Sequence, residues 1–256
     1  MEKLKSETQE RASSVASKST KAGVDRPSLF EWRDGSPFFR GVRVERRELT
    51  VAHQTFRIAL LKDAAELLDD PEIAREFIEA GRAPYGLELW PAAIMLAEVI
   101  LTGEDGGGRP ALDLGCGLGL TAMAATVRGW RVVAVDHDPA ALRFTEHNTQ
   151  DNGIDLYALE LWDWNRPPAD RRFHRVFGAD VLYQRMDHVP ILRCLESVVH
   201  ETGSALLTDP RRSVADGFAA LATDHGWFVD TLPAAAANFE GRPIQGRVFV
   251  LRRRVS

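Results

Sequence analysis

The stretch Ala111-Leu-Asp-Leu-Gly-Cys-Gly-Leu-Gly-Leu-Thr121 joins a short apolar run to three glycines at alternate positions. A segment compatible with a helix follows as far as residue 127, and a second apolar run then ends in Asp136. This order is typical of a strand–helix–strand unit that binds a nucleoside, because glycines let the backbone turn tightly and approach a ligand. Asp136, at the tip of the second strand, is placed to accept hydrogen bonds from ribose hydroxyls.

The spacing of the glycines distinguishes between two kinds of nucleoside ligand. A dinucleotide fingerprint needs its last glycine at position 120, where a pyrophosphate rests on the helix N-terminus, but the third glycine here is Gly119. Asp113 would also place a carboxylate near the loop, which disfavours a pyrophosphate and suits a cation. S-adenosylmethionine has no phosphate and carries an ammonium and a sulfonium, so the loop predicts this cofactor rather than NAD. A glycine-rich turn without a ligand is the alternative. The cofactor-binding candidates of this unit are Asp113, Gly115, Cys116, Gly117, Gly119 and Asp136.

The composition limits the classes of function. The chain has 256 residues, enough for one large α/β domain with an appendage, and its formal net charge of -5 argues against general nucleic-acid binding. Two cysteines give no disulfide framework, seven histidines show no metal-ligand spacing, and no Gly-x-Ser-x-Gly motif occurs. No apolar run reaches membrane-spanning length, and the N-terminus lacks the apolar core of a signal peptide. We expect a cytoplasmic protein that binds neither a metal nor a membrane.

Three regions differ in composition. Residues 1–26 are rich in Ser, Lys, Thr and Glu, which predicts a disordered tail or, alternatively, a recognition arm. Residues 27–83 form a predicted appendage, in which apolar residues at every second position between 42 and 60 indicate two strands in a hairpin. Segments 64–68 and 71–80 of this appendage look helical. The appendage could shape a lid over a substrate pocket or only pack against the fold. Residues 84–256 form the predicted S-adenosylmethionine-binding domain.

Aromatic residues stand at two positions where a ligand could bind. Trp90 precedes a mostly buried helix, and its indole could cover a ligand at the neighbouring strand ends or cap the core. A strand over 156–161 ends in Trp162-Asp163-Trp164, and in a doubly wound sheet this end adjoins the ligand crevice. Asp163 could accept a hydrogen bond from an adenine amino group while a ring such as Trp164 supports the base. The alternative is that both tryptophans close the core.

The next strand, Val176-Phe-Gly-Ala-Asp-Val-Leu-Tyr183, is expected beside the first strand of the glycine unit. Asp180 and Tyr183 would then lie near the carboxyl end of the sheet, where chemistry on a bound cofactor takes place. An unpaired buried carboxylate is costly, so Asp180 needs either a salt bridge within the fold or a functional role. The remaining elements alternate strand and helix and end in a predicted antiparallel strand over 246–253. The sequence therefore predicts a doubly wound α/β sheet with an antiparallel last strand.

These motifs resemble the class I, seven-β-strand methyltransferases, which have a Rossmann-like fold. More narrowly, the chain is similar to the protein-lysine methyltransferase group that acts on the electron-transfer-flavoprotein β-subunit and on AAA-type and Hsp70-type chaperones. Asp209-Pro-Arg-Arg212 is similar to the Asp-Pro-Gly-Arg run of the flavoprotein-modifying branch, with Arg211 in place of glycine. The resemblance extends from about residue 84 to residue 212. The other matching stretches are Leu89-Trp-Pro-Ala-Ala93, Asp113–Gly119, Asp136, Leu161-Trp-Asp-Trp164 and Ala179-Asp-Val-Leu-Tyr183, which carries the group's Asp-x-x-Tyr signature.

The resemblance implies roles for individual residues. Asp180 and Tyr183 would be catalytic and border the channel for the target amine, with Asp180 holding that amine and stabilising the charge that develops on it. The implied reaction transfers a methyl group to the lysine ε-amine of a protein and leaves S-adenosylhomocysteine. A small-molecule amine as substrate and a non-catalytic cofactor-binding partner protein are the alternatives, whereas the acidic balance disfavours a nucleic-acid methyltransferase. The residues implied to line the S-adenosylmethionine site are Trp90, Gly115, Gly117, Asp136, Trp164 and Ala179.

Overall fold

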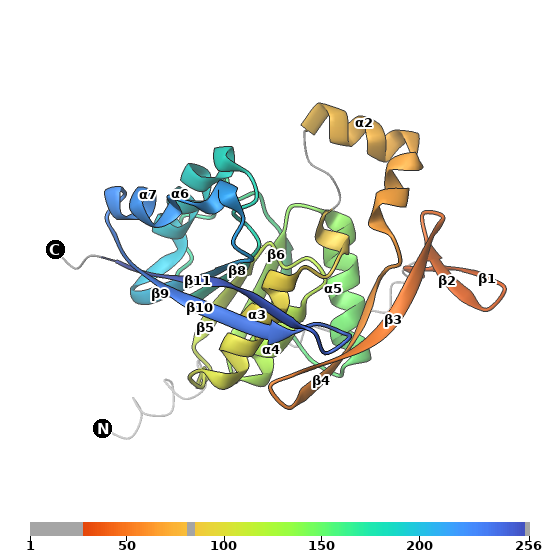
Figure 1. The fold of residues 1–256 in the computed structure, drawn as a ribbon, viewed down its shortest axis with the longest axis horizontal. Coiled ribbons are helices and arrows are strands. Elements are labelled where there is room, and N and C mark those ends of the chain that lie inside the picture. The colour runs from red at the N-terminus through yellow and green to blue at the C-terminus, as the bar shows by residue number, and fades with distance from the viewer. Residues whose placement is uncertain (1–27, 81–84, 254–256) are drawn as a thin grey trace, which may run out of the picture.

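The computed structural model describes residues 28–80 and 85–253 and contains two β-sheets (Figure 1). The predicted disordered tail, residues 1–26, lies outside the described residues. None of the described helices combines the length and the apolar character needed to cross a membrane.

The larger sheet has seven strands in the order β10-β11-β9-β8-β5-β6-β7. β11 is antiparallel to both of its neighbours, and every other pair of neighbours in this sheet is parallel. The predicted doubly wound sheet with an antiparallel last strand is therefore confirmed. The chain order reverses between β5 and β8, which is where ligands bind in such sheets. The strands are β5 (Pro110–Leu114), β6 (Arg131–Asp136), β7 (Ala158–Leu161), β8 (Phe173–Ala179), β9 (Val199–Asp209), β10 (Trp227–Ala237) and β11 (Pro243–Arg253).

Helices cover both faces of this sheet. Successive residues of a strand point to opposite faces, so Ala111 and Leu112 of β5 belong to two different hydrophobic clusters. The cluster of Ala111 contains α3 (Pro91–Thr102), α4 (Leu120–Val127) and α5 (Pro139–Asp151). The cluster of Leu112 contains α6 (His188–Val198) and α7 (Phe218–Asp224). Both faces are thus apolar, as parallel strands buried between two helical layers require.

The smaller sheet is an antiparallel meander with the strand order β1-β2-β3-β4. β3 (Val42–Val51) and β4 (Gln54–Leu61) form the predicted hairpin. β1 (Glu31–Arg33) and β2 (Ser36–Phe39) were not predicted, because strands of three and four residues are too short to show an alternating pattern. The short helix η1 (Ala64–Asp69) and α2 (Pro71–Ala80) follow at the predicted positions.

The N-terminal sheet is fixed to α5 through side chains that pair with its backbone. Asn148 accepts a hydrogen bond from Ala59 N at 2.8 Å and donates to Ala59 O at 3.2 Å. Asn152 pairs in the same way with Arg57, with an accepted bond of 2.8 Å and a donated bond of 2.7 Å. Figure 1 shows these N-terminal strands on the side of the molecule where α5 lies. The N-terminal sheet is therefore attached, through α5, to the larger sheet and its helices.

One predicted strand ends earlier than expected. β8 stops at Ala179, whereas the apolar run of residues 176–183 predicted a strand that continues to Tyr183. Asp180 has a φ angle of 55°, in the left-handed region that extended strands do not use. Asp180 and Tyr183 consequently belong to the loop that follows β8, at the carboxyl end of the sheet, and not to the strand itself.

Candidate functional site

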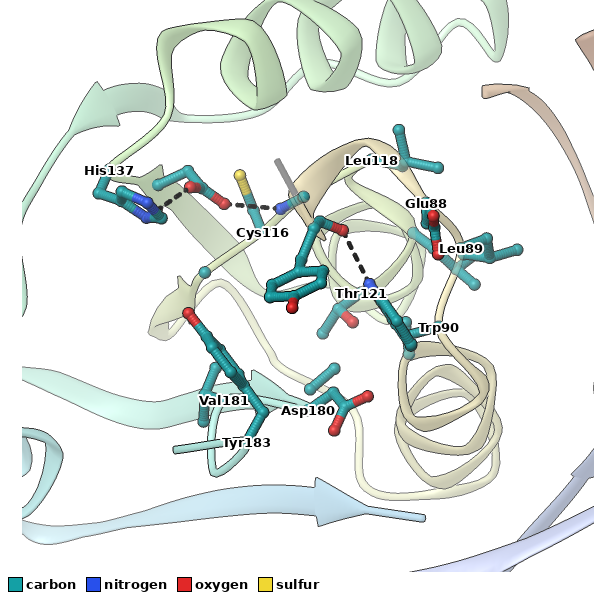
Figure 2. A pocket seen from close by; sticks show the side chains of 18 of the residues that line it. Glu88, Leu89, Trp90, Cys116, Leu118, Thr121, His137, Asp180, Val181 and Tyr183 are labelled. Carbon is teal, nitrogen blue, oxygen red and sulfur yellow. Dashed lines mark hydrogen bonds and ion pairs between the residues drawn. The ribbon is translucent and has the colours of Figure 1, made fainter. Parts of the chain in front are cut away.

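A cavity of about 330 Å³ lies beyond the carboxyl ends of β5, β6 and β8. Figure 2 shows Asp180 and Tyr183 across this cavity from His137 and Cys116. Its volume is in the range of small-ligand sites in proteins. The predicted site residues that line it are Trp90, Gly115, Cys116, Gly117, Asp136, Trp164, Ala179, Asp180 and Tyr183. The predicted site residues that do not line it are Asp113, Gly119 and Asp163.

The glycine loop, residues 115–119, has three glycines in left-handed conformations. The φ angles are 72° at Gly115, 53° at Gly117 and 82° at Gly119, which side chains other than glycine rarely adopt. A Cβ atom at Gly117 would lie 3.1 Å from Gly86 O, so the loop and the short helix η2 (Tyr85–Leu87) approach each other closely. The glycines are therefore needed both for the turn itself and for the space beside it.

Asp136 ends β6 and lines the cavity. Its Oδ2 atom accepts a hydrogen bond of 2.9 Å from the backbone N–H of Gly117, and its Oδ1 atom accepts one of 3.0 Å from the N–H of Asp138. The imidazole of His137 lies 3.3 Å from Oδ1. A carboxylate has about four acceptor positions, so Asp136 retains capacity for a ligand's hydroxyl groups.

Asp113 is buried in β5 behind the glycine loop and is 1% exposed. Neither of its carboxylate oxygens has a hydrogen bond of normal geometry within the described residues. Burial, reinforced by the charge of Asp136, raises the pKa of Asp113 to about 8, and the backbone N–H of Ala122 opposes this shift. Asp113 is consequently protonated at neutral pH and presents no negative charge to the cavity.

Cys116 and the helix behind it support the loop rather than supply a nucleophile. Burial, with the charge of Asp136, raises the pKa of the Cys116 thiol well above its usual value, so the thiol stays protonated. The Thr145 hydroxyl of α5 lies 3.5 Å from this sulfur and donates a hydrogen bond of 2.7 Å to Gly117 O. Asn148 of the same helix donates to Leu118 O at 3.0 Å.

The two aromatic positions predicted from the sequence differ in their surroundings. Trp164 is buried and lines the cavity, whereas Asp163 accepts hydrogen bonds from the backbone and side-chain nitrogens of Asn165 at 2.9 and 2.7 Å. The Asp163 side chain therefore turns toward its own loop. Trp90 also lines the cavity, and its indole N–H donates a hydrogen bond of 2.7 Å to Tyr85 O.

Asp180 forms a bidentate ion pair; the sequence analysis weighed a salt bridge at this residue but did not name Arg212 as its partner. Its two carboxylate oxygens accept hydrogen bonds of 2.7 Å each from Nε and Nη2 of Arg212. The Asp180 side chain is 5% exposed and the Arg212 side chain 35% exposed, so the pair lies at the wall of the cavity with its acid buried. The hydrogen bonds that Arg212 donates to Asp180 raise the pKa of Arg212. The guanidinium carbon of Arg212 also lies 5.2 Å from the centre of the Trp90 ring.

Among the lining residues that the sequence analysis did not name as site residues, Tyr85, Glu88 and Arg212 bring aromatic or charged groups to the cavity. Tyr85 contacts both Trp90 and Tyr183, with ring centres 5.8 and 5.7 Å apart. Glu88 contributes a third carboxylate beside those of Asp136 and Asp180, and its pKa is raised by partial burial and by the nearby charge of Asp63. Arg212 belongs to the Asp-Pro-Arg-Arg run that the sequence singled out, so a signal for it existed.

The class of protein follows from comparison of this chain with known families. A family model described as a methyltransferase domain matches residues 106–238, which is more than half of the chain. The chain belongs to this methyltransferase domain family. The predicted methyltransferase class is therefore confirmed.

Curated relatives of this chain are ribosomal protein L11 methyltransferases. The protein of Marinobacter nauticus is 28% identical over 168 residues, covering 62% of this chain and 51% of the relative. The protein of Serratia proteamaculans is 30% identical over 151 residues, covering 58% of this chain and 50% of the relative. The chain thus spans about half the length of these curated relatives. The narrower resemblance to the flavoprotein- and chaperone-modifying group stays a prediction.

Solved structures support the fold. The mitomycin 7-O-methyltransferase MmcR superposes with a TM-score of 0.52 and 18% identity, covering 75% of this chain and 61% of that structure. The YcgJ protein of Bacillus subtilis superposes with a TM-score of 0.50 and 15% identity, covering 63% of this chain and 99% of that structure. At these identities the likeness concerns the fold alone.

Proposed function

We propose that this chain is an S-adenosylmethionine-dependent methyltransferase that modifies a lysine ε-amine of a protein substrate. The observation that carries the proposal is that the glycine loop, Asp136 and Asp180 all face one cavity at the point where the strand order reverses. A nucleoside-binding wall and a polar wall suited to an amine thus share a single space. The two cysteines are free and buried, which agrees with the cytoplasmic location that we propose.

The residues present fit S-adenosylmethionine. The glycine loop offers room that a side chain would fill, since a Cβ atom at Gly115 would lie 3.2 Å from Val181 Cγ1. Asp136 supplies acceptors for ribose hydroxyls, and Trp164 and Leu118 give the cavity apolar surface for a base. Asp113, being protonated and behind the loop, does not supply the negative charge that the sequence analysis expected beside a cationic ligand, and it would act on the cofactor only through the loop.

When bound, S-adenosylmethionine supplies a methyl group on a sulfonium, which passes to a nitrogen lone pair as the carbon–sulfur bond breaks and S-adenosylhomocysteine is left. The protein's task is mainly alignment and exclusion of water. Asp180 would accept a hydrogen bond from the incoming amine, and Tyr183 would pack beside the aliphatic stem of the lysine. Tyr85 is in ring contact with both Tyr183 and Trp90, so these three aromatic side chains form one part of the cavity wall.

A protein substrate is favoured over a small amine by the relatives of this chain, whose name gives a ribosomal protein as their substrate. Acidic residues at the cavity also favour a cationic lysine side chain as ligand, because Glu88 lines the cavity and Asp63 lies close to Glu88. We do not assign ribosomal protein L11 itself, since the aligned part covers only about half of those relatives.

The proposal is tested in two steps. Calorimetry of the purified chain with S-adenosylhomocysteine should show one binding site, and absence of binding would contradict the cofactor assignment. Incubation with S-adenosylmethionine carrying a labelled methyl group, in a lysate of cells lacking this protein, should label a protein band whose modified residue mass spectrometry identifies as lysine. Label found only in small molecules would support the alternative, a small-molecule N-methyltransferase.

A variant links the site to the transfer step. Asp180→Asn should bind S-adenosylhomocysteine as the wild type does and lose most of the methyl transfer to the labelled band, because the amide leaves Arg212 without its counter-charge beside the acceptor nitrogen, on which positive charge develops. Unchanged transfer by this variant would show that Asp180 has no part in the reaction.

A further inference from the structure

The buried acid that faces the proposed acceptor site is already neutralised by the fold. Arg212 Nε and Nη2 each donate a 2.7 Å hydrogen bond to a different oxygen of Asp180, which is the strongest geometry available to a guanidinium and a carboxylate. Glu88 lines the same cavity but has no such partner in the hydrogen bonds or ion pairs of the described residues. The two carboxylates therefore differ in the net charge that they present.

The guanidinium of Arg212 is held in place by its surroundings and not only by Asp180. The backbone N–H of Arg212 donates to Asp209 Oδ1 at 3.3 Å, and Asp209 is 1% exposed. Arg247, on β11, donates to Asp209 Oδ2 at 2.8 Å and to the carbonyl oxygen of Arg212 at 3.1 Å. The Trp90 ring lies beside the guanidinium. The loop after β9 thus aims Arg212 at Asp180 before any ligand arrives.

Asp180 is positioned just as firmly. Its backbone N–H donates to Thr208 O at 3.0 Å, next to the start of the Arg212 loop, and its left-handed backbone turns the side chain to meet the guanidinium. A non-glycine residue in this conformation costs free energy that the surrounding contacts must offset. The chain therefore maintains a strained acid in order to place it against one particular arginine.

An ion pair and a lone carboxylate select different forms of an amine. A lone carboxylate attracts the ammonium form and raises the pKa of the amine, which keeps the nitrogen lone pair protonated and unreactive. A carboxylate paired with arginine carries almost no net charge, but its remaining lone pairs still accept an N–H hydrogen bond. Such a pair can orient an amine without favouring its charged form.

We propose that Arg212 is the specificity-determining residue that makes this site accept the acceptor amine in its neutral form. The inference rests on the proposed function, because it assigns Asp180 to the acceptor side of the cofactor. Glu88, at the rim, attracts the cationic side chain, and the Asp180–Arg212 pair receives its nitrogen after the proton has left to water.

The inference is tested without the protein substrate by comparing two probes. Sinefungin is an analogue of S-adenosylmethionine in which an ammonium-bearing carbon replaces the methylated sulfur, whereas S-adenosylhomocysteine has no charge at that position. In calorimetry at pH 8, we compare the affinity for sinefungin with the affinity for S-adenosylhomocysteine in each protein. The ratio of these two affinities should be about tenfold or more higher for Arg212→Met than for the wild type. A change of this size is equivalent to a shift of about one unit or more in the pKa of the bound ammonium. Asp180→Asn should shift the ratio in the opposite direction, because Arg212 is then left without its counter-charge.

Two controls separate charge compensation from general damage. Arg212→Lys keeps the positive charge and should leave the ratio of the two affinities near that of the wild type. Arg211→Met removes the same charge from the exposed neighbouring residue and should change neither affinity. If Arg212→Met does not fold, Asp180→Asn still tests the inference from the other side of the pair.

The outcomes distinguish the two proposals. If S-adenosylhomocysteine binds and the ratio is the same in the wild type, Arg212→Met and Asp180→Asn, the charge-compensation role of Arg212 is overturned while the cofactor assignment stands. If neither probe binds the wild type, the proposed function itself fails. Once the substrate is known, Arg212→Met should also move the pH profile of kcat to higher pH, because kcat reports the pKa of the amine in the bound complex, and a purely structural role of Arg212 would not move it.

Discussion

The backbone N–H of Gly117 donates a hydrogen bond of 2.9 Å to Oδ2 of Asp136. The acid at the tip of β6 thereby holds the glycine loop and faces the cavity at the same time. The Asp136 carboxylate and the glycine loop that it holds line the same cavity. A change at Asp136 therefore affects both the hydrogen bonds to the ligand and the shape of the cavity wall.

We expect Asp136→Ala to weaken binding of S-adenosylhomocysteine by about 100-fold or more. Two hydrogen bonds to a charged group at about 1.5 kcal/mol each are enough for a loss of this size. Isothermal titration calorimetry measures the change. Asp138→Ser is the matched control, because serine keeps the helix cap that Asp138 provides to Ala140 N while removing a charge two residues away. Equal affinities of Asp136→Ala and the wild type would contradict the assignment of Asp136 to the ribose.

Gly119→Ala should destabilise the fold more than the same change at another glycine of similar backbone conformation. The φ angle is 82° at Gly119 and 63° at Gly153. A Cβ atom at Gly119 would lie 2.8 Å from Thr145 Cγ2, whereas nothing lies within 4 Å of one at Gly153. We expect a loss of about 1 kcal/mol for Gly153→Ala and at least about 2 kcal/mol for Gly119→Ala, measured by urea unfolding.

The collision at Gly119 can be relieved, which gives a further check. Thr145→Ser removes Cγ2 and keeps the hydroxyl that bonds to Gly117 O, so Gly119→Ala in a Thr145→Ser background should lose less stability than in the wild-type background. Equal losses in both backgrounds, or equal losses at Gly119 and Gly153, would show that the contact with Thr145 is not the cause.

Asn148→Ala should cost more stability than Asn152→Ala, although both side chains pair with the backbone of β4. Asn148 is fully buried and serves Ala59 N, Ala59 O and Leu118 O, so its removal leaves buried polar groups without partners. The backbone of Arg57, which pairs with Asn152, lies at an exposed position and can be hydrated instead. We expect a difference of about 2 kcal/mol or more in the free energy of unfolding.

The same two variants separate two roles of α5, which are to attach the N-terminal sheet and to support the glycine loop. Asn148 donates to Leu118 O in the glycine loop, and Asn152 makes no contact with that loop among its hydrogen bonds. Asn148→Ala should therefore weaken binding of S-adenosylhomocysteine, while Asn152→Ala should not. Equal affinities for both variants would mean that the loop does not depend on α5 for its shape.

Local signals account for the parts of the fold that were predicted well. The helix over 120–127 was predicted with the bounds that α4 has, because Gly119 ends the loop in a left-handed conformation and the residues that follow are apolar. Asp138 and Pro139 likewise mark the start of α5, where the Asp138 side chain caps Ala140 N. Signals of this kind lie within a few residues of the feature that they predict.

The parts that were missed depend on residues far apart in the chain. The end of β8 was placed four residues too late because residues 176–183 look uniformly apolar apart from Asp180. What ends the strand is the left-handed turn at Asp180, whose side chain meets Arg212, 32 residues further on. The alternative weighed for Asp180, a salt bridge within the fold, is thus present in the structure, and no local pattern names the partner. Glu88 and Tyr85 join the site through the same kind of long-range packing.

The pKa of Asp113 gives a prediction about the pH dependence of stability. This group titrates near pH 8 in the folded protein, well above its ordinary value of 3.8, because burial disfavours its charged form. Between these two pH values the folded state keeps a proton that the unfolded chain releases, so the stability that Asp113 contributes is complete below about pH 4 and falls as the pH rises toward 8.

Asp113→Asn removes this titration, because the amide is neutral at every pH. From pH 5 to pH 8 the wild type should therefore lose on the order of 3 kcal/mol more than Asp113→Asn in the free energy of unfolding, measured by urea denaturation at each pH. Asp155→Asn, at an exposed position, should follow the wild type. Parallel pH profiles for the wild type and Asp113→Asn would mean that Asp113 is ionised in the folded protein and has a partner behind the glycine loop.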